Sequence, residues 1–169
     1  MDSIEIQKSF LALYDESADA VFRHSYFRVH DRELAKDLTQ EAFARMWEYL
    51  AAGKAVDNKK AFLFRILNNL IIDYYRKKKE LSLDAMAESG FDPKGDGHES
   101  VEAFALGQEA LRAVGGLDEN FREVITLRYV NDLSIGEIAE ITRESENAVS
   151  VRLHRAVKKL KDVLEHGPS

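Results

Sequence analysis

The chain of 169 residues contains no cysteine and only two prolines. Without cysteine it has no disulfide framework, thiol nucleophile or thiolate metal site. None of its five histidines stands at H-x-x-x-H spacing, so we expect neither a metal site nor a cofactor. The chain also lacks an apolar run of membrane-spanning length and a basic-then-apolar segment at residues 1–10, and we therefore expect a cytoplasmic protein.

An excess of positive charge is also missing, because the formal net charge is -6. This balance is unfavourable for a nucleic-acid-binding protein, since lysine and arginine supply most non-specific affinity by neutralising phosphates. The charges are unevenly spread, however: acidic residues crowd 80–109, whereas 76–79 and 152–161 are strongly basic. The pattern predicts weak DNA binding by the chain alone and stronger binding within a complex.

Helical periodicity dominates from Ile4 onward, and the strict alternation typical of strands is scarce. The hydrophobic content of 45% is enough for real cores, and the pattern predicts an all-α protein of two small helical domains. We assign them to 1–80, where 10–29 predicts a helix pair, and to 102–169. The flexible acidic linker between them, 81–101, has a glycine-containing and acidic composition that cannot bury a core. It is either merely soluble or shields a basic face when DNA is absent, and both interpretations stay open.

The most informative stretch is S-E-N-A-V-S-V-R-L-H-R-A-V-K-K-L-K at 145–161. Read at helical period, one face is apolar and the opposite face is suited to contact an anionic partner. Upstream, L-S-I-G-E-I-A-E-I-T-R at 133–143 predicts a short amphipathic helix, and the two segments together have the pattern of a helix-turn-helix. Ser134 and Glu137 form a capping box for the first helix, and Ser145 caps the second. The polar face of the long helix comprises Asn147, Val151, His154, Arg155 and Lys158.

A second motif, D-L-T-Q-E-A-F-A-R-M-W at 37–47, predicts a helix with a broad apolar arc. The opposite arc is acidic and contains no lysine. An ordinary solvated face is one interpretation, since charged outer faces are the norm. A docking face for a basic or amide-rich partner helix is the alternative. The acidic arc comprises Asp37, Gln40, Glu41, Ala44 and Glu48.

The stretch 61–79 predicts a long helix that follows a loop at 51–60. An amide side chain both donates and accepts, which suits the reading of a base edge, and an aromatic ring can stack on an unpaired base. Lysines at the carboxyl end of a helix commonly only complement its dipole, so they are weak support by themselves. The polar side of this helix comprises Arg65, Asn68, Asn69, Asp73 and Arg76, with Phe62 at its margin.

Taken in order, D-L-T-Q-E-A-F-A-R-M-W, then F-L-F-R-I-L-N-N-L-I-I-D-Y-Y-R at 62–76, then R-E-V-I-T-L-R-Y followed by the helix-turn-helix resemble the bacterial extracytoplasmic-function (ECF) sigma factors. The resemblance covers residues 10 to about 164. It implies a region-two domain at 1–80 that docks on core RNA polymerase and melts the minus-ten element, and a region-four domain at 102–169 that reads the minus-thirty-five element of promoter DNA. It also implies a protein that is not an enzyme, and regulation by an anti-sigma factor.

The resemblance assigns roles to individual residues. Polymerase docking falls to three residues of the acidic arc: Asp37, Gln40 and Glu41. DNA contacts in region two fall to Asn58, Lys59, Lys60, Phe62, Arg65, Asn69, Arg76, Lys77 and Lys78. DNA contacts in region four fall to Asn147, Ser150, Val151, Arg152, His154, Arg155, Lys158 and Lys159. Three departures from the family pattern are Phe62 where tryptophan is frequent, Ser150 where a basic residue is common, and the turn at Thr142-Arg143, where glycine is usual nearby.

Two other function classes are compatible with parts of the pattern. A stand-alone helix-turn-helix repressor or activator would bind its operator tightly without polymerase, which the net negative charge and the asparagine face argue against. An enzyme would need convergent catalytic groups, yet the carboxylates fall on solvated helical faces with no matching histidine or serine arrangement. The sequence therefore favours a sigma factor.

Overall fold

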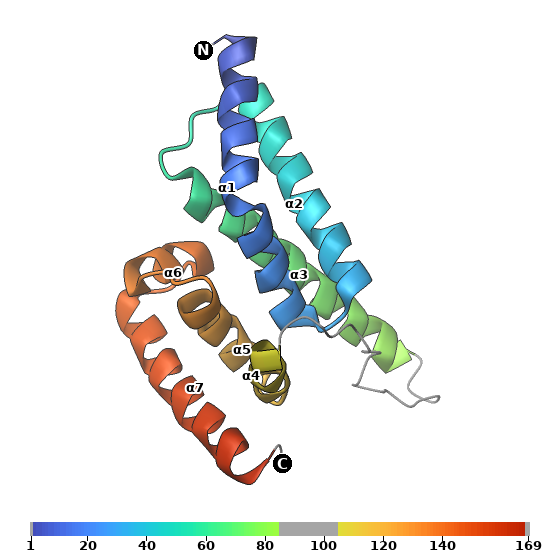
Figure 1. The fold of residues 1–169 in the computed structure, drawn as a ribbon, viewed down its shortest axis with the longest axis vertical. Helices are drawn as coiled ribbons and strands as arrows, with labels where there is room; N and C mark the ends of the chain where they lie inside the picture. The colour runs from blue at the N-terminus through green and yellow to red at the C-terminus, as the bar shows by residue number, and fades with distance from the viewer. Residues whose placement is uncertain (1, 85–104, 168–169) are drawn as a thin grey trace.

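The computed structural model describes residues 2–84 and 105–167, and within those ranges it contains helices and no strand. The predicted all-α class is therefore confirmed for the described residues. Residues 81–84, assigned above to the linker, belong to a helix, and the rest of the predicted linker lies outside the described residues. The elements, drawn in Figure 1, are α1 Ser3–Val29, α2 Arg32–Ala51, α3 Lys59–Asp84, α4 Ala105–Gly115, α5 Glu119–Ile125, the π-helical turn η3 Thr126–Val130, α6 Ile135–Thr142 and α7 Glu146–His166.

The predicted helix pair at 10–29 is wrong, because α1 is one continuous helix over that range. Asp2 starts it in a capping box, with its side chain accepting from the backbone N–H of Ile4 and with Glu5 reaching back to the cap. Ser17, a residue type that could have capped a second helix, is instead buried inside α1. The helix ends where His30 takes a left-handed conformation, with φ of 57°.

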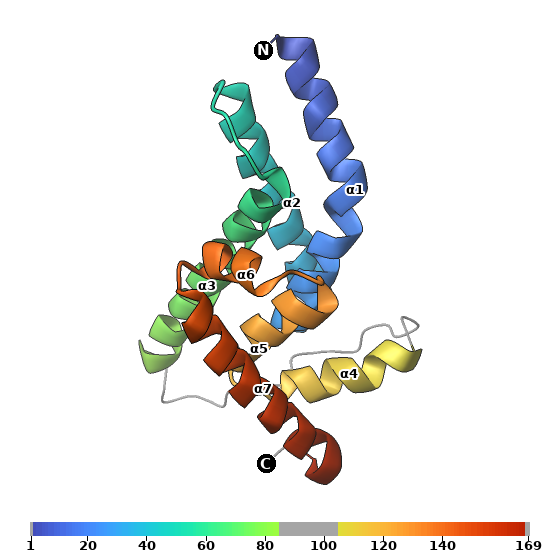
Figure 2. The ribbon, with the colours of Figure 1, turned by 90° about the vertical axis from the view of Figure 1, so that its left-hand side faces the viewer.

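The first three helices share one core. α2 returns antiparallel to α1 after a short turn, and α3 crosses them (Figures 1 and 2). The apolar arc predicted for α2 faces inward and the acidic arc faces outward. The fully buried side chains at the centre of this core are Val21, Ala42, Met46, Leu63, Phe64, Leu67 and Ile71.

The remaining helices form the second half of the molecule, in which α7 packs on α5 and α6. Local capping explains both starts in the helix-turn-helix. Ser134 and Glu137 form the predicted capping box, with both hydrogen bonds at 3.0 Å, and Ser145 Oγ accepts from Ala148 N at 3.0 Å. The buried apolar side chains here include Val124, Ile125, Leu127, Leu133, Ile138, Ile141, Val149 and Ala156.

The two halves pack against each other. α6 lies on α3, and α1 contacts α4, α5 and η3, so the buried apolar side chains form a single continuous cluster (Figure 2). None of the described helices combines the length and apolar content needed to cross a bilayer. Nor does the described part of the chain bring together three acidic or histidine side chains in a way that could hold a metal ion.

Candidate nucleic-acid interface

The outer face of α2 carries the residues assigned to polymerase docking. Asp37, Gln40 and Glu41 are all exposed, and Glu41 forms an intrahelical ion pair with Arg45 at 2.9 Å. Phe43 packs inward, with its ring centroid 6.2 Å from that of Phe10. The helix therefore has an exposed acidic and amide face opposite its buried apolar face.

A pocket of about 370 Å³ lies where the α2–α3 loop meets the start of α3. This volume is near the lower end of the roughly 300–1,000 Å³ typical of ligand pockets. Phe62 and Tyr49 provide aromatic walls, with ring centroids 4.6 Å apart, and Arg65 provides a partly buried cation. Aromatic faces beside a cation can hold an unpaired base by stacking and hydrogen bonding. The pocket is lined by Tyr49, Ala55, Val56, Asp57, Asn58, Ala61, Phe62, Arg65 and Glu140.

Two pocket residues differ from their sequence-based description. Asn58 caps the start of α3, since its Oδ1 accepts from Ala61 N at 3.0 Å. One of its polar atoms is therefore already used in a hydrogen bond within the chain. Tyr49 is missing from the residues predicted for the site. By helical period it shares the arc of buried Leu38 and Ala42, so the pattern assigns it to the core and gives no signal of the pocket.

The outer side of α3 continues from the pocket as a polar surface. Asn69 is exposed, and Arg76 forms a 2.8 Å ion pair with Asp73. Lys77 and Lys78 are exposed, and the ammonium of Lys78 lies 5.8 Å from the centre of the Tyr74 ring. These cations lie at the surface, and Arg76 and Lys78 also interact with side chains of the same helix. At the start of the helix, Lys60 is exposed and Lys59 is partly exposed.

Asn68 does not belong to this surface, and its predicted place on an asparagine face is wrong. It is 1% exposed, and its Oδ1 accepts from Arg28 Nη1 at 2.8 Å. Its side-chain amide therefore forms a hydrogen bond inside the protein and is not presented to a ligand. Asn69 alone remains to offer an amide outward from α3.

The turn of the helix-turn-helix contains no glycine. Arg143 takes the left-handed conformation, with φ of 61°, and Ser145 then caps α7. A residue with a Cβ pays roughly 1–2 kcal/mol for this conformation. The turn, whose geometry the sequence did not predict, is thus made by an arginine, and α7 begins directly after it.

The outward face of α7 carries the residues assigned to promoter reading. Seven of the eight are exposed, in agreement with the face predicted from helical period. Val149, Ala156 and Val163 are the buried residues of the opposite face. The exposed set comprises Asn147, Ser150, Val151, His154, Arg155, Lys158 and Lys159.

Arg152 is the eighth residue assigned to DNA contacts on α7, and it is only partly exposed because its side chain points toward α5 and the turn. Its Nη1 lies 2.6 Å from Glu123 Oε1, and its Nη2 lies 2.6 Å from Glu144 Oε1. Nη1 also donates to the carbonyl of Asn120 at 3.1 Å. The guanidinium ties α7 to α5 and to the turn, so a phosphate contact, which remains a prediction, would have to break these pairs.

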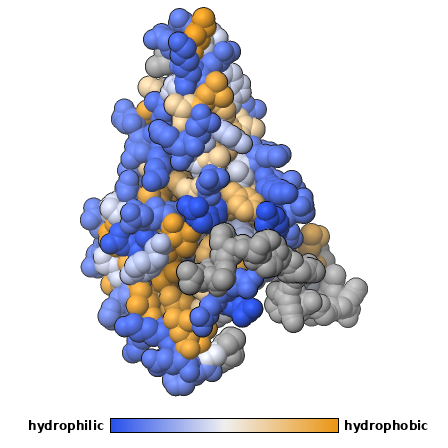
Figure 3. Space-filling model, in the orientation of Figure 1, coloured by the Kyte–Doolittle hydropathy of each residue, from blue (hydrophilic) through white to orange (hydrophobic). Residues whose placement is uncertain are grey.

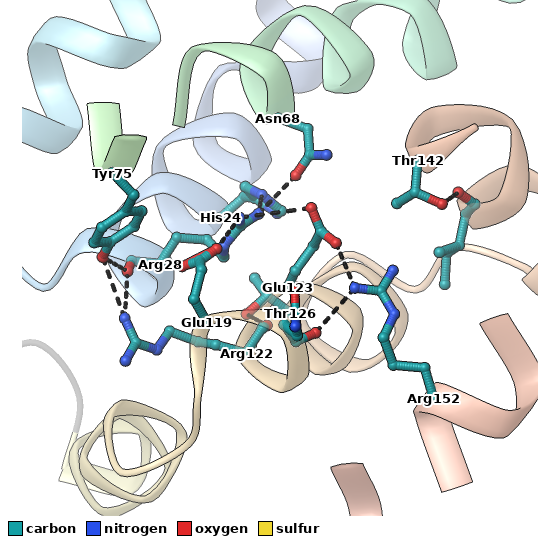
Figure 4. A network of polar contacts seen from close by, with 12 residues as sticks. His24, Arg28, Asn68, Tyr75, Glu119, Arg122, Glu123, Thr126, Thr142 and Arg152 are labelled. Atoms are coloured by element: carbon teal, nitrogen blue, oxygen red, sulfur yellow. Dashed lines mark hydrogen bonds and ion pairs between the residues drawn. The ribbon is translucent and has the colours of Figure 1, made fainter. Parts of the chain in front are cut away.

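Between the two halves lies a cluster of buried polar side chains that the sequence pattern did not predict (Figure 4). Arg28 on α1 is fully buried, and its guanidinium pairs with Glu119 and lies 3.7 Å from Glu123 Oε2, both on α5. From the other direction, Arg122 Nη1 donates to the carbonyl of Arg28 at 3.0 Å and to the hydroxyl of Tyr75 at 3.2 Å. Removing one partner from a buried ion pair commonly costs about 3–5 kcal/mol. We call this set the interdomain polar cluster.

His24 extends the cluster to η3 and its neighbour Asn131. Arg28 can only donate, so His24 Nε2, at 3.1 Å from Arg28 Nη1, must accept. His24 Nδ1 then carries the proton and donates to Asn131 Oδ1 at 2.8 Å, while Asn131 Nδ2 donates to the Ala20 carbonyl at 3.1 Å. Burial and, second, the charge of Arg28 lower the pKa of His24 to about 3.

A signal for this cluster was present in the sequence. His24 and Arg28 share the buried face of α1 with Leu13 and Val21, so two polar groups stand on an otherwise apolar stripe. A buried charge needs a partner. Helical period cannot name that partner, because Glu119 lies 91 positions away from Arg28.

The contact between the halves is expected to weaken in mild acid. His24 must be neutral in the folded chain, where its pKa is about 3, whereas its unperturbed value is 6.5. The contribution of neutral His24 to the free energy of unfolding is complete above pH 6.5, and it is lost as the pH falls from 6.5 towards 3. Between pH 7 and pH 5 we expect about 2 kcal/mol less free energy of unfolding from His24 alone. His30, whose pKa is lowered to about 4 by burial and by Arg122, acts in the same direction.

Denaturant unfolding at pH 7 and pH 5 measures this effect. His24→Gln is the matched control, because an amide can accept from Arg28 and donate to Asn131 without titrating. The variant should lose less stability than the parent over the same interval. Equal losses in the two proteins would contradict the role given to His24.

Two family descriptions match the chain, one in each half. Sigma-70 region 2 matches residues 13–80, and Sigma-70 region 4 matches residues 107–160. These two matches, one in each helical half, identify the chain as an RNA polymerase sigma factor. The chain belongs to the ECF sigma factors, which are not enzymes.

Similar proteins agree with this assignment. The ECF RNA polymerase sigma factor BldN of Streptomyces coelicolor is 30% identical over 163 residues, which cover 92% of this chain and 60% of BldN. SigX of Bacillus subtilis is 25% identical, with coverage of 95% and 86%. SigW of Bacillus subtilis is 28% identical, with coverage of 94% and 90%. The chain thus spans less than two thirds of BldN but most of SigX and SigW.

Two solved structures share the fold. RpoE from Bartonella quintana, crystallised with the anti-sigma factor NepR, matches with a TM-score of 0.75 at 22% identity, over 94% of this chain and 98% of that one. CnrH in complex with the cytosolic domain of CnrY matches with a TM-score of 0.68 at 25% identity, over 94% and 89%. The likeness covers both halves of the chain.

Proposed function

We propose that this sigma factor binds core RNA polymerase through the outer face of α2 and directs it to promoters that α3 and α7 read. The observation that carries the proposal is the separation of charge between exposed faces: acidic and amide residues on α2, and basic and amide residues on α3 and α7. The first suits a basic or amide-rich protein helix and the second suits DNA. Because core RNA polymerase works in the cytoplasm, we place the protein there.

In region two, the pocket beside the α2–α3 loop is the candidate minus-ten site. Tyr49 and Phe62 would stack on a flipped non-template base, with Arg65 and Asn69 within the same polar surface. Flipping costs a few kcal/mol, and stacking returns about 1–3 kcal/mol per base. The cations that would hold the backbone are the partly exposed Lys59 and the exposed Lys60, Arg76, Lys77 and Lys78.

In region four, α7 is the candidate recognition helix for the minus-thirty-five element. A helix that enters the major groove reads base edges with side chains of one exposed face, near its amino-terminal part. Ser150, Val151, His154 and Arg155 occupy that face, and Asn147 precedes them. Lys158 and Lys159, farther along α7, would contact phosphates.

We also propose that an anti-sigma factor regulates this chain. The similar RpoE was crystallised with one, NepR. Figure 3 shows apolar side chains reaching the surface in the lower half of the view, where Figure 1 places α4, α5 and α7. Leu164 of α7 is 55% exposed. Exposed apolar surface flanked by polar side chains is the usual docking site for an amphipathic partner helix.

Binding measurements with and without polymerase test the proposed function. The purified chain should bind core polymerase saturably, and it should bind promoter DNA much more tightly as holoenzyme than alone. Tight and specific DNA binding without polymerase, together with no affinity for core, would contradict the proposal and favour a stand-alone regulator. A promoter-free DNA of equal length serves as the control for non-specific binding.

A further inference from the structure

Arg152 belongs to α7 but lies at the edge of its buried side. It follows Val149 by three positions and precedes Ala156 by four, and both of these residues are fully buried. The Arg152 side chain is only 15% exposed, whereas Arg155 on the same helix is exposed. This placement directs the Arg152 guanidinium toward the neighbouring elements of the chain.

The guanidinium joins α5, the turn and α7 at one point. Nη1 lies 2.6 Å from Glu123 Oε1 and donates to the Asn120 carbonyl at 3.1 Å, both on α5. Nη2 lies 2.6 Å from Oε1 of Glu144 in the turn. Figure 4 shows the Arg152 side chain directed toward Glu123. A planar guanidinium can bind two carboxylates in a defined geometry, whereas a lysine ammonium is a single point charge.

The contact with Glu144 acts on the turn that joins α6 to α7. Arg143 takes the left-handed conformation there, which is unfavourable for a residue with a Cβ. Glu144 is the next residue, and its backbone N–H donates to the Ala139 carbonyl at 3.0 Å. The ion pair between Glu144 and α7 therefore stabilises a turn that glycine would adopt without strain.

We propose that Arg152 is a positioning residue for promoter reading: its two ion pairs hold α7 in the orientation that presents the outward face to the minus-thirty-five element. The proposal rests on the proposed function, because it takes α7 as the recognition helix. It replaces the phosphate contact that the family resemblance implies for Arg152. Donors already directed at two carboxylates and a carbonyl are not directed at DNA.

The partners of Arg152 all come from the second half of the chain. Glu123 uses Oε1 for Arg152, while its other oxygen, Oε2, faces Arg28 of the first half at 3.7 Å. The Arg152 ion pairs therefore do not depend on the contact between the halves. Base readout needs side chains held within about 0.5 Å of their productive geometry. A helix whose orientation is set before it meets DNA loses less free energy to ordering on binding.

Glu144→Gln tests the proposal because its two possible effects on DNA binding have opposite signs. Loss of a carboxylate beside α7 favours binding to a polyanion by charge alone. Loss of the ion pair instead lets the turn and α7 shift. We expect holoenzyme with this variant to bind its promoter roughly 10-fold more weakly, the size of one lost base contact, with no loss of affinity for promoter-free DNA.

The promoter is taken from the transcripts of wild-type holoenzyme, and base preference is measured on single-base variants of its minus-thirty-five element. Glu146→Gln is the matched control, because Glu146 is exposed and forms no ion pair within the described ranges of the chain. It should bind the promoter at least as tightly as the parent. Arg152→Lys keeps the charge but not the two-carboxylate geometry, so it should lose promoter affinity and base preference as Glu144→Gln does.

Three results would overturn the proposal. Glu144→Gln could bind the promoter as tightly as the parent, or Arg152→Lys could keep the parent's affinity and base preference, as a phosphate contact would. Equal losses for promoter and promoter-free DNA in Glu144→Gln would show a general defect of region four and not a change of orientation. If wild-type holoenzyme shows no base preference in any upstream element, the proposed function fails instead.

Discussion

Replacing Asp37 and Glu41 with lysine is expected to abolish binding to core RNA polymerase without unfolding the chain. Both residues are exposed on α2, and the substitution breaks the surface ion pair between Glu41 and Arg45. Such pairs contribute only about 0–1 kcal/mol to stability. Charges of the wrong sign against a complementary partner cost several kcal/mol, which corresponds to a loss of affinity of roughly 100-fold or more.

A titration of labelled protein with core polymerase measures the effect. Asp15→Lys with Glu16→Lys is the control, since both residues are exposed on α1 and the change in net charge is the same. The control should bind like the parent. Loss of binding in both variants would indicate a general charge effect, and unchanged binding in the α2 variant would refute the assignment of this face.

Arg155→Ala is expected to cost about 1–3 kcal/mol at one base pair of the upstream promoter element. Arg155 is exposed on the outward face of α7, whose opposite face is anchored by Val149 and Ala156. If its guanidinium reads guanine, the wild-type preference at that position should disappear in the variant. The other positions of the element should keep their preferences.

Holoenzyme affinity for a set of single-base promoter variants measures this preference. Lys158→Ala is the matched comparison, because a lysine on phosphate should weaken all sequences alike and lower the salt slope by about 1. A uniform loss for Arg155→Ala, with the base preference intact, would assign Arg155 to the backbone instead.

Much of the fold follows from local chemistry that the sequence displays. The caps at Ser134 and Ser145 begin α6 and α7 as predicted, and the acidic arc of α2 and the polar face of α7 are exposed. These features depend on helical period and on side chains within one turn. The predicted helix pair at 10–29 is wrong because α1 continues through this range, with Ser17 buried and its neighbours Asp15 and Glu16 exposed.

The arrangement of the two halves depends on contacts that no local pattern records. Arg28 forms hydrogen bonds with Asn68 and Glu119, which are 40 and 91 positions away in the sequence. His24 forms one with Asn131, which is 107 positions away. The family resemblance assigns Arg152 to a phosphate contact, yet its guanidinium pairs with two carboxylates. The helical period predicts which face of its helix a side chain occupies. Its partner depends on how helices that are far apart in the sequence pack against each other.

Sequencing of the transcripts made on genomic DNA by core polymerase, with and without this protein, tests its role as a promoter-specificity subunit most directly. We expect new start sites that appear only with the sigma factor and share a minus-ten and a minus-thirty-five element at fixed spacing. Start sites that are identical in the two reactions, despite active core polymerase, would contradict this role.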